Sequence, residues 1–334
     1  MKLRSLLVLA FAAAPFLPIA CGGGNDKMPP PPPAPMPRMM PSASTSVTAS
    51  LADAAPPPPA APPVLLVQGT ASPDPVAPLP SVKIVAPTSG QLIVDKAGDF
   101  QVKLDVKNWQ TATGSSHVHL ILDNKPYKPI YDTKAPIKLS DLSPDPLTEG
   151  EHTLVAFASR MNHESVKTKD ALTMLSFFVG KKGDVKTDLK KPILIYSRPK
   201  GEYKGDNASH LLVDFQIANV TLAEGKENVH LTVSGPGIEK ALEAKVEKFG
   251  APYYLDNLQN GQYTVKAELD GADGKMLPGP WNSTTRTITI NRDAPADPMP
   301  AMNMGAMDAG APATADAAKP APVSAKPMDA GAKK

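Results

Sequence analysis

Two histidines that stand one residue apart, His117 and His119, are the residues of this sequence best suited to metal chemistry. They lie in the segment HVHLILD, whose residues alternate in the way that is typical of a β-strand with one buried face. Side chains two positions apart on a strand share a face and lie roughly 7 Å apart. Two imidazoles in this arrangement can hold one zinc or copper ion together.

Further polar residues follow in the same third of the chain and complete a candidate site. Four of the six histidines of the chain lie between residues 117 and 163. The candidate ligand- or metal-binding residues are His117, His119, His152, Arg160, His163 and Glu164. The alternative interpretation is a solvated sheet face and a loop that is held by a structural Arg160–Glu164 pair. No spacing among these residues is diagnostic of a metal site, so both interpretations stay open.

A second group of soft ligands lies near the C-terminus, in the segment MPAMNMGAMD. Thioethers prefer Cu(I), and a flexible methionine-rich segment is suited to copper capture outside the cytoplasm. The alternative is compositional drift in an unselected tail. The candidate Cu(I) residues are Met299, Met302, Met304 and Met307.

Nothing in the sequence predicts an enzyme. There is no G-x-S-x-G motif and no glycine-rich phosphate loop. The pair His163-Glu164 does not continue into the zinc-protease motif H-E-x-x-H, because Lys167 stands at its last position. The carboxylates are scattered, without a pair that the sequence places together.

An internal repeat positions the candidate residues. The segments FQVKLDV, HVHLILD, EGEHTLVA and FFV begin at residues 100, 117, 149 and 177, and similar segments begin at 211, 228, 260 and 288. The offset is constant, since 211 − 100, 228 − 117, 260 − 149 and 288 − 177 all equal 111. Four matching segments at one spacing indicate a duplicated domain.

The matching segments read as strands, and about 100 residues of short alternating strands without helices fit an immunoglobulin-like β-sandwich. The predicted fold is therefore all-β, with two tandem sandwiches between disordered tails. In both copies the apolar face is buried, so we expect His117 and His119 on the other face. The predicted parts are a signal peptide at 1–21, a Pro/Ala-rich stalk at 22–80, sandwiches at 81–180 and 192–291, a Lys-rich linker at 181–191 and a tail at 292–334.

The first copy resembles a group of bacterial envelope proteins of unassigned activity. The resemblance is carried by HVHLILDNKPY, by the strand GEHTL and by the loop SRMNHESVK. It implies a shared architecture and no particular reaction. The second copy has lost most of the polar residues, because the positions of His117, His152 and Arg160 become Asn228, Tyr263 and Gly271.

The N-terminus predicts export and lipid anchoring. Basic residues precede a short apolar run, which is the pattern of a cleavable signal, and the run ends in Ile19-Ala20-Cys21-Gly22. This resembles the lipobox of bacterial lipoproteins and implies lipidation of Cys21, the only cysteine of the chain. Since Gly22 is not the aspartate of inner-membrane retention, the outer membrane is the expected location. The alternative is an ordinary secretory signal with an incidental cysteine.

The chain is thus predicted to be a lipid-anchored envelope protein that acts as a non-catalytic binding or scaffold module. Loops on a rigid sandwich are the usual place of recognition, here 107–116, 124–136 and 158–170, with an envelope protein or polysaccharide as the unnamed partner. The alternative is an extracytoplasmic copper- or zinc-binding protein. Nucleic acid is not indicated, because the net charge is only +2 and no basic cluster interleaves with aromatic residues.

Overall fold

The described part of the chain, residues 61–297, folds into strands joined by turns in the computed structural model. Its helical content is limited to four short 3₁₀ turns, which are η1 (Ala97–Asp99), η2 (Leu139–Leu142), η3 (Lys169–Ala171) and η4 (Gly205–Ala208). No helix among these residues is long and apolar enough to cross a membrane.

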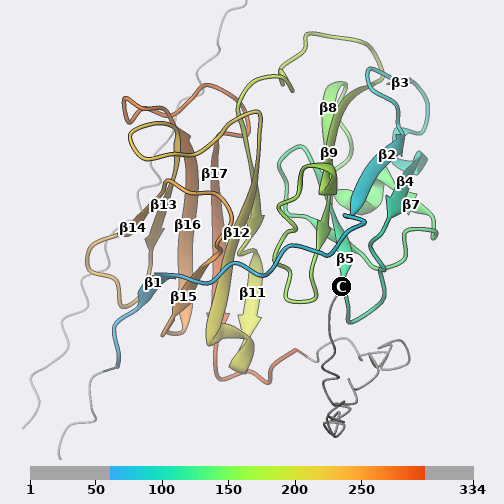
Figure 1. The fold of residues 1–334 in the computed structure, drawn as a ribbon. Coiled ribbons are helices and arrows are strands. Elements are labelled where there is room, and N and C mark those ends of the chain that lie inside the picture. The colour runs from blue at the N-terminus through green and yellow to red at the C-terminus, as the bar shows by residue number, and fades with distance from the viewer. Residues whose placement is uncertain (1–60, 298–334) are drawn as a thin grey trace, which may run out of the picture. The chain divides into compact units, whose positions relative to one another are not determined.

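The first sandwich pairs a three-stranded sheet with a five-stranded sheet (Figure 1). The smaller sheet has the order β2 (Ser81–Ala86), β4 (Gln101–Lys107) and β7 (Ile137–Lys138). The larger sheet has the order β3 (Leu92–Ile93), β9 (Leu172–Val179), β8 (Gly150–Ser159), β5 (His117–Leu122) and β6 (Lys128–Ile130).

The second sandwich repeats this order and adds one strand. One sheet runs β10 (Ile193–Arg198), β12 (His210–Ala218), β15 (Tyr253–Asp256) and β1 (Leu65–Gln68). The other runs β11 (Gly201–Lys204), β17 (Ser283–Asn291), β16 (Gly261–Asp270), β13 (Asn228–Ser234) and β14 (Leu242–Val246). Strands β5, β8 and β9 begin 111 residues before β13, β16 and β17. The predicted fold class, a duplicated immunoglobulin-like sandwich, is confirmed.

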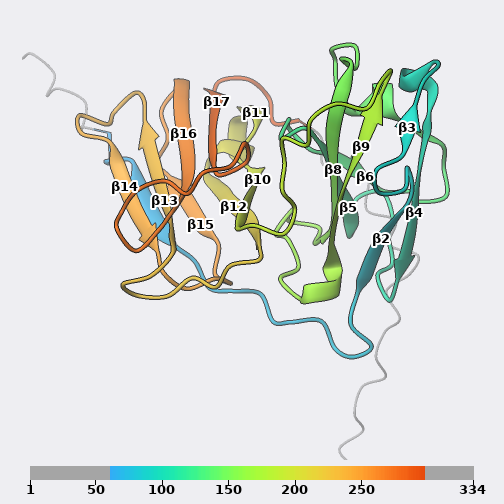
Figure 2. The same cartoon turned by 90° about the horizontal axis from the view of Figure 1, so that it is seen from above.

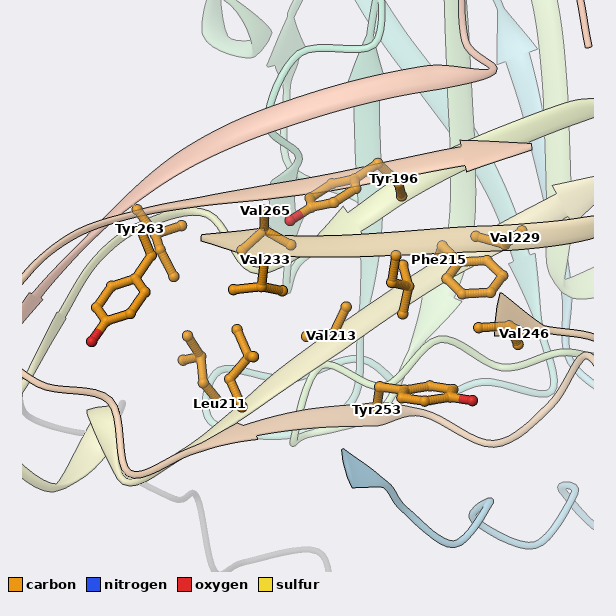
Figure 3. Packing of buried hydrophobic residues seen from close by; sticks show 14 of the residues in the cluster. Tyr196, Leu211, Val213, Phe215, Val229, Val233, Val246, Tyr253, Tyr263 and Val265 are labelled. Atoms are coloured by element: carbon orange, nitrogen blue, oxygen red, sulfur yellow. The ribbon is translucent and has the colours of Figure 1, made fainter. Parts of the chain in front are cut away.

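Each sandwich has its own apolar core, built by the alternating residues of its strands. Val118, Leu120 and Leu122 of β5 are at most 1% exposed and pack against residues of the opposite sheet, such as Val82. In the second sandwich the equivalent face of β13 packs among residues such as Phe215 (Figure 3). Burying one such side chain contributes roughly 1.5–3 kcal/mol.

The outer face of β5 is buried as well, which corrects the prediction of a solvated face. Ile121 packs with Phe157 of β8 and with Ile195 and Trp281 of the second sandwich, and all four lie within one compact unit. His117 and His119 are fully buried on this strand. Alternation identified two faces of the strand, but it could not reveal that the second sandwich covers the histidine face.

The predicted stalk is wrong over its last twenty residues. Residues 61–80 are described, and β1 forms an antiparallel pair with β15, in which Leu66 lies opposite Leu255. From β1 the chain runs extended past both sandwiches to β2 (Figure 2). The physical reason is that Val64 reaches the second core, where it is only 4% exposed, and prolines on either side of a short edge strand do not prevent its pairing.

Candidate metal centre

His117 and His119 are fixed by the strands on both sides of them. In the ladder between β5 and β8, His117 lies opposite Ser159, and His119 lies opposite Phe157. Their side chains are two positions apart and so share a face. Because that face is covered, both rings have little freedom to turn away from each other.

His163 reaches the same place from the loop between β8 and β9. The loop is a tight turn, in which Arg160 N donates to Glu164 O and His163 N donates to Arg160 O, each at 2.9 Å. His163 has a φ of +68°, a left-handed conformation that few residues other than glycine adopt. This conformation turns the ring back over β5. The hydrogen bonds that close the loop offset the conformational strain of the left-handed backbone.

Three ring nitrogens converge in this arrangement. His117 Nε2 lies 3.0 Å from His119 Nε2 and 2.9 Å from His163 Nδ1, and the third distance, from His119 Nε2 to His163 Nδ1, is 3.3 Å. A tetrahedral zinc ion with Zn–N bonds of about 2.0–2.1 Å separates its nitrogen ligands by about 3.3–3.4 Å. The observed triangle is close to that size, and these three residues form a candidate metal-binding group.

Two of the other ring nitrogens make hydrogen bonds that are compatible with the tautomers required for ligation. His117 Nδ1 lies 3.0 Å from the carbonyl oxygen of Ser115, which only accepts, so the ring proton belongs on Nδ1 and Nε2 keeps its lone pair. His119 Nδ1 lies 3.2 Å from the hydroxyl of Ser197, which can accept in the same way. Hydrogen bonds of this kind orient histidine ligands in metal sites. In the metal-free protein a proton on His163 Nδ1 can be shared between His117 Nε2 and His119 Nε2, and one cation at the same place would contact all three nitrogens.

Burial keeps the three imidazoles uncharged. It lowers the pKa of His117 to about 4 and that of His163 to about 2, with the positive charge of Arg198 acting in the same direction. Burial also holds the pKa of His119 well below its ordinary value, and the neighbouring histidines add to the effect. The lone pairs are therefore available to a metal ion at neutral pH without prior loss of a proton.

Aromatic and cationic residues surround the nitrogens. The ring of Tyr127 stacks on that of His119 with centroids 3.5 Å apart, and the Tyr131 ring lies 4.8 Å from that of His117. Burial raises the pKa of Tyr127, against the lowering effect of Arg198. Arg198 ends β10, so the second sandwich supplies part of the centre.

A cleft of about 670 Å³ lies beside the centre. His163, Tyr131 and Arg198 line the cleft, and so do Tyr203 and Tyr254 of the second sandwich. His163 is only partly buried, and it is the member of the triad that faces this opening. One of the three histidines therefore borders a cleft, while the other two are fully buried.

The structure brings together only three of the six residues that the sequence grouped. His152 lies elsewhere, with its Nδ1 2.6 Å from Asp123 Oδ2. Glu164 points away from the histidines and accepts hydrogen bonds from the backbone and hydroxyl of Ser72 at 3.1 and 2.5 Å. Arg160 donates to the carbonyl oxygen of Pro73 at 2.6 Å.

These contacts also correct the predicted Arg160–Glu164 pair. The two side chains do not bond to each other, and each instead holds the extended segment that follows β1. Because Glu164 is only 3% exposed, its carboxylate depends on these partners. The segment thereby fastens the loop that carries His163.

Sequence reasoning missed Tyr127, Ser197 and Arg198 as neighbours of the histidines. The first lies in the predicted loop 124–136, and the other two loops, 107–116 and 158–170, contribute Ser115 and His163. The alternating pattern carried no signal for the residues from the second copy. Cys21 and the methionines Met299, Met302, Met304 and Met307 lie outside the described residues.

No family model matches the sequence, and no curated protein matches it either. Solved structures with a similar arrangement include the fibronectin(III)-like modules of Clostridium thermocellum CbhA, at 14% identity over 65% of this chain and 98% of that chain, with a TM-score of 0.23. The FN1–FN3 domains of chicken CNTN1 match at 13% identity over 65% and 67%, with a TM-score of 0.22. The two tandem V-type regions of VCBP3 match at 9% identity over 64% and 99%, with a TM-score of 0.21. Identities this low concern the fold alone and assign no ligand.

Proposed function

We propose that this chain is a non-catalytic, extracytoplasmic metal-binding protein, in which His117, His119 and His163 hold one zinc or copper ion. Lipidated Cys21 would anchor it to the cell envelope. The sequence predicted metal binding as the alternative to recognition through loops, and the geometry of the three histidines supports metal binding.

The observation that supports this function is the triangle of three ring nitrogens, with edges of 2.9, 3.0 and 3.3 Å, at a largely buried position. Buried polar atoms are normally paired with hydrogen-bond partners of opposite kind. Here three ring nitrogens converge on one another, which is also the arrangement of a closed ligand set. Imidazole ligands suit zinc and copper, among other transition metals.

The repeat supplies a matched control for a test. His119 corresponds to His230 in the second copy, since 119 + 111 = 230. His230 is also a strand histidine, but it is partly exposed and lies 3.3 Å from the carboxylate of Glu243. It therefore reports what one strand histidine outside the triad contributes.

The experiment is calorimetric titration of the purified, chelator-stripped protein with Zn(II) and with Cu(II). We expect one ion per chain, with loss of that binding in His119→Asn and in His163→Asn and no loss in His230→Asn. Circular dichroism and the melting temperature establish that each variant is folded. Absence of heat with both metals, or equal loss in the His230 variant, would reject the metal centre.

The anchoring part of the proposal has a separate test. Expression in a bacterial host with radiolabelled palmitate should label the unmodified chain and leave Cys21→Ser unlabelled. The unmodified chain should partition into the detergent phase, and the variant into buffer. A mature chain that carries no acyl group would reject the anchor and leave the metal centre untouched.

A further inference from the structure

The cleft beside the three histidines has the size and the mixed lining of a small-molecule site. Its volume of about 670 Å³ falls within the range of roughly 300–1,000 Å³ that is usual for such sites. Each of the three loops in which the sequence predicted recognition reaches the cleft, through Ser115, Tyr131 and Asn162. Strands β11 and β12 and the turn η4 of the second sandwich supply further lining residues. The predicted recognition loops therefore border one cavity.

Arg198 presents an unpaired cation to this cleft. Its Nε donates a hydrogen bond to the Tyr127 hydroxyl at 2.8 Å, but its two terminal nitrogens donate none within the described part of the chain. Among those residues it also forms no salt bridge. The other cation of the lining, Lys204, is paired with Asp297 at 3.1 Å and with Glu202 at 3.6 Å. Two terminal nitrogens of one guanidinium can bind a carboxylate through two parallel hydrogen bonds.

His210 offers a flat surface in the same cleft. Its ring stacks on that of Tyr254, with centroids 3.8 Å apart and an interplanar angle of 14°, and its Nδ1 lies 2.6 Å from Asp256 Oδ1. The His210 side chain is nevertheless 58% exposed, so the ring face that is turned away from Tyr254 is open to a ligand. A planar side chain that is held in this way packs against the apolar face of another ring. A sugar ring has such a face, which its C–H groups form.

Polar groups along the cleft are available to bind hydroxyl groups. The side-chain hydroxyls of Ser115 and Ser209 bond to no other described residue, and the amide nitrogen of Asn162 donates to none of them. The Asp206 carboxylate forms no salt bridge in residues 61–297, and it can only accept hydrogen bonds. Sugar hydroxyls both donate and accept, so they match this combination of groups. Asp206 and the two acids that pair with Lys204 also disfavour a ligand that carries several negative charges.

We propose that this cleft binds an acidic sugar, a saccharide unit that carries one carboxylate. The guanidinium of Arg198 pairs with the carboxylate, the ring of His210 packs against the sugar ring, and the neutral polar groups of the lining bind the hydroxyls. The inference goes beyond the proposed function and does not depend on a bound metal ion. Binding involves no covalent step.

The test is a titration of the full, metal-stripped and chelator-free chain with glucuronate and with glucose, followed by ligand-observed NMR. The two sugars differ only at the carbon that carries the carboxylate. We expect glucuronate to bind at least about tenfold more tightly, because hydrogen bonds to a charged group are lost with glucose. This preference should vanish in Arg198→Gln and persist in Lys204→Gln, the matched variant that removes a cation already paired with carboxylates.

Two further measurements complete the test. His210→Ala, which removes an exposed ring, should weaken the binding of both sugars and leave their ratio unchanged, and it serves as the test if circular dichroism shows that Arg198→Gln is unfolded. A disaccharide that ends in glucuronate should bind more tightly than glucuronate if the natural ligand is the end of a glycan, and equally if it is the single sugar; both results support an acidic sugar. Equal affinity for glucuronate and glucose, no saturable binding of either, a preference that survives Arg198→Gln, or unchanged affinities in His210→Ala would overturn the proposal.

Discussion

Lowering the pH should destabilise the metal-free protein strongly, but it should weaken the zinc affinity of the folded protein only slightly. The perturbation is a change from pH 7 to pH 5.5 in the unmodified protein, where histidine protons compete with zinc. Three histidines with the ordinary pKa of 6.5 would weaken the apparent affinity about 600-fold over this interval. In the folded chain the pKa of His117 lies at about 4 and that of His163 at about 2, while that of His119 is held well below 6.5. We therefore expect a change of less than about twofold.

The same low pKa values make the stability of the metal-free protein strongly dependent on pH. Since the folded pKa values lie below the unfolded ones, the unfolded chain binds more protons below pH 6.5, and stability falls as pH falls. Three such histidines lower the free energy of unfolding of the metal-free protein by about 4 kcal/mol between pH 7 and pH 5.5. Below pH 4 the loss from His117 levels off, because its folded form then takes up its own proton.

The assay is a zinc titration against a chromophoric competitor at both pH values, with near-ultraviolet circular dichroism to verify that the protein is folded at pH 5.5. Urea unfolding of the metal-free protein gives the second quantity. A several-hundred-fold weakening in protein that remains folded would refute the reasoning, because the histidines would then titrate as exposed groups.

Three other perturbations test polar contacts of the fold, of which the first fastens the loop that carries His163. Ser72→Ala removes the hydroxyl that donates a hydrogen bond to the buried carboxylate of Glu164. The free energy of unfolding in urea should fall by about 1–3 kcal/mol, and zinc should bind more weakly. Unchanged values would show that the segment after β1 does not fasten the loop. Burial lowers the pKa of His152, but the hydrogen bonds to Asp123 and to the carbonyl oxygen of Thr148, together with the charge of Asp123, outweigh burial and raise the pKa above 6.5. These contacts therefore stabilise the fold below pH 6.5, and the stability is lost as pH rises through the folded pKa. Asp123→Asn should flatten the fall in melting temperature above pH 6.5, and an unaltered slope would contradict the assignment. Asp214→Asn leaves Lys167, whose Nζ lies 2.7 Å from Asp214 Oδ1, without its buried countercharge. The free energy of unfolding should fall by about 3–5 kcal/mol. A loss below about 1 kcal/mol, the value of a surface ion pair, would show that the contact is not formed.

The strand pattern and the repeat were available from the sequence because they are local properties. Period-two alternation in segments such as 117–123 follows from the geometry of a strand, and duplication preserves it at a fixed offset. The pairing of His117 and His119 was predictable for the same reason. His163 was included in the candidate group without any local signal that it would meet the other two.

Other parts of the site could not be predicted, because they depend on contacts between distant segments. His152 shares its strand alternation with the candidates, yet it bonds to Asp123 on another part of the sheet. The extended segment around Ser72 reads as a proline-rich tail, yet it reaches Glu164, 92 residues away. Composition describes the solubility of such a segment and not the surface against which it lies.

The sequence by itself determined that two sibling β-sandwiches are present and that two imidazoles share one strand face, since both follow from periodicity along the chain. Only the tertiary structure decided that this face is buried. The second sandwich covers it, and the loop between β8 and β9 turns His163 onto it at 2.9 Å from His117. Burial lowers the pKa of the three imidazoles, so they are uncharged at neutral pH and can bind a metal ion.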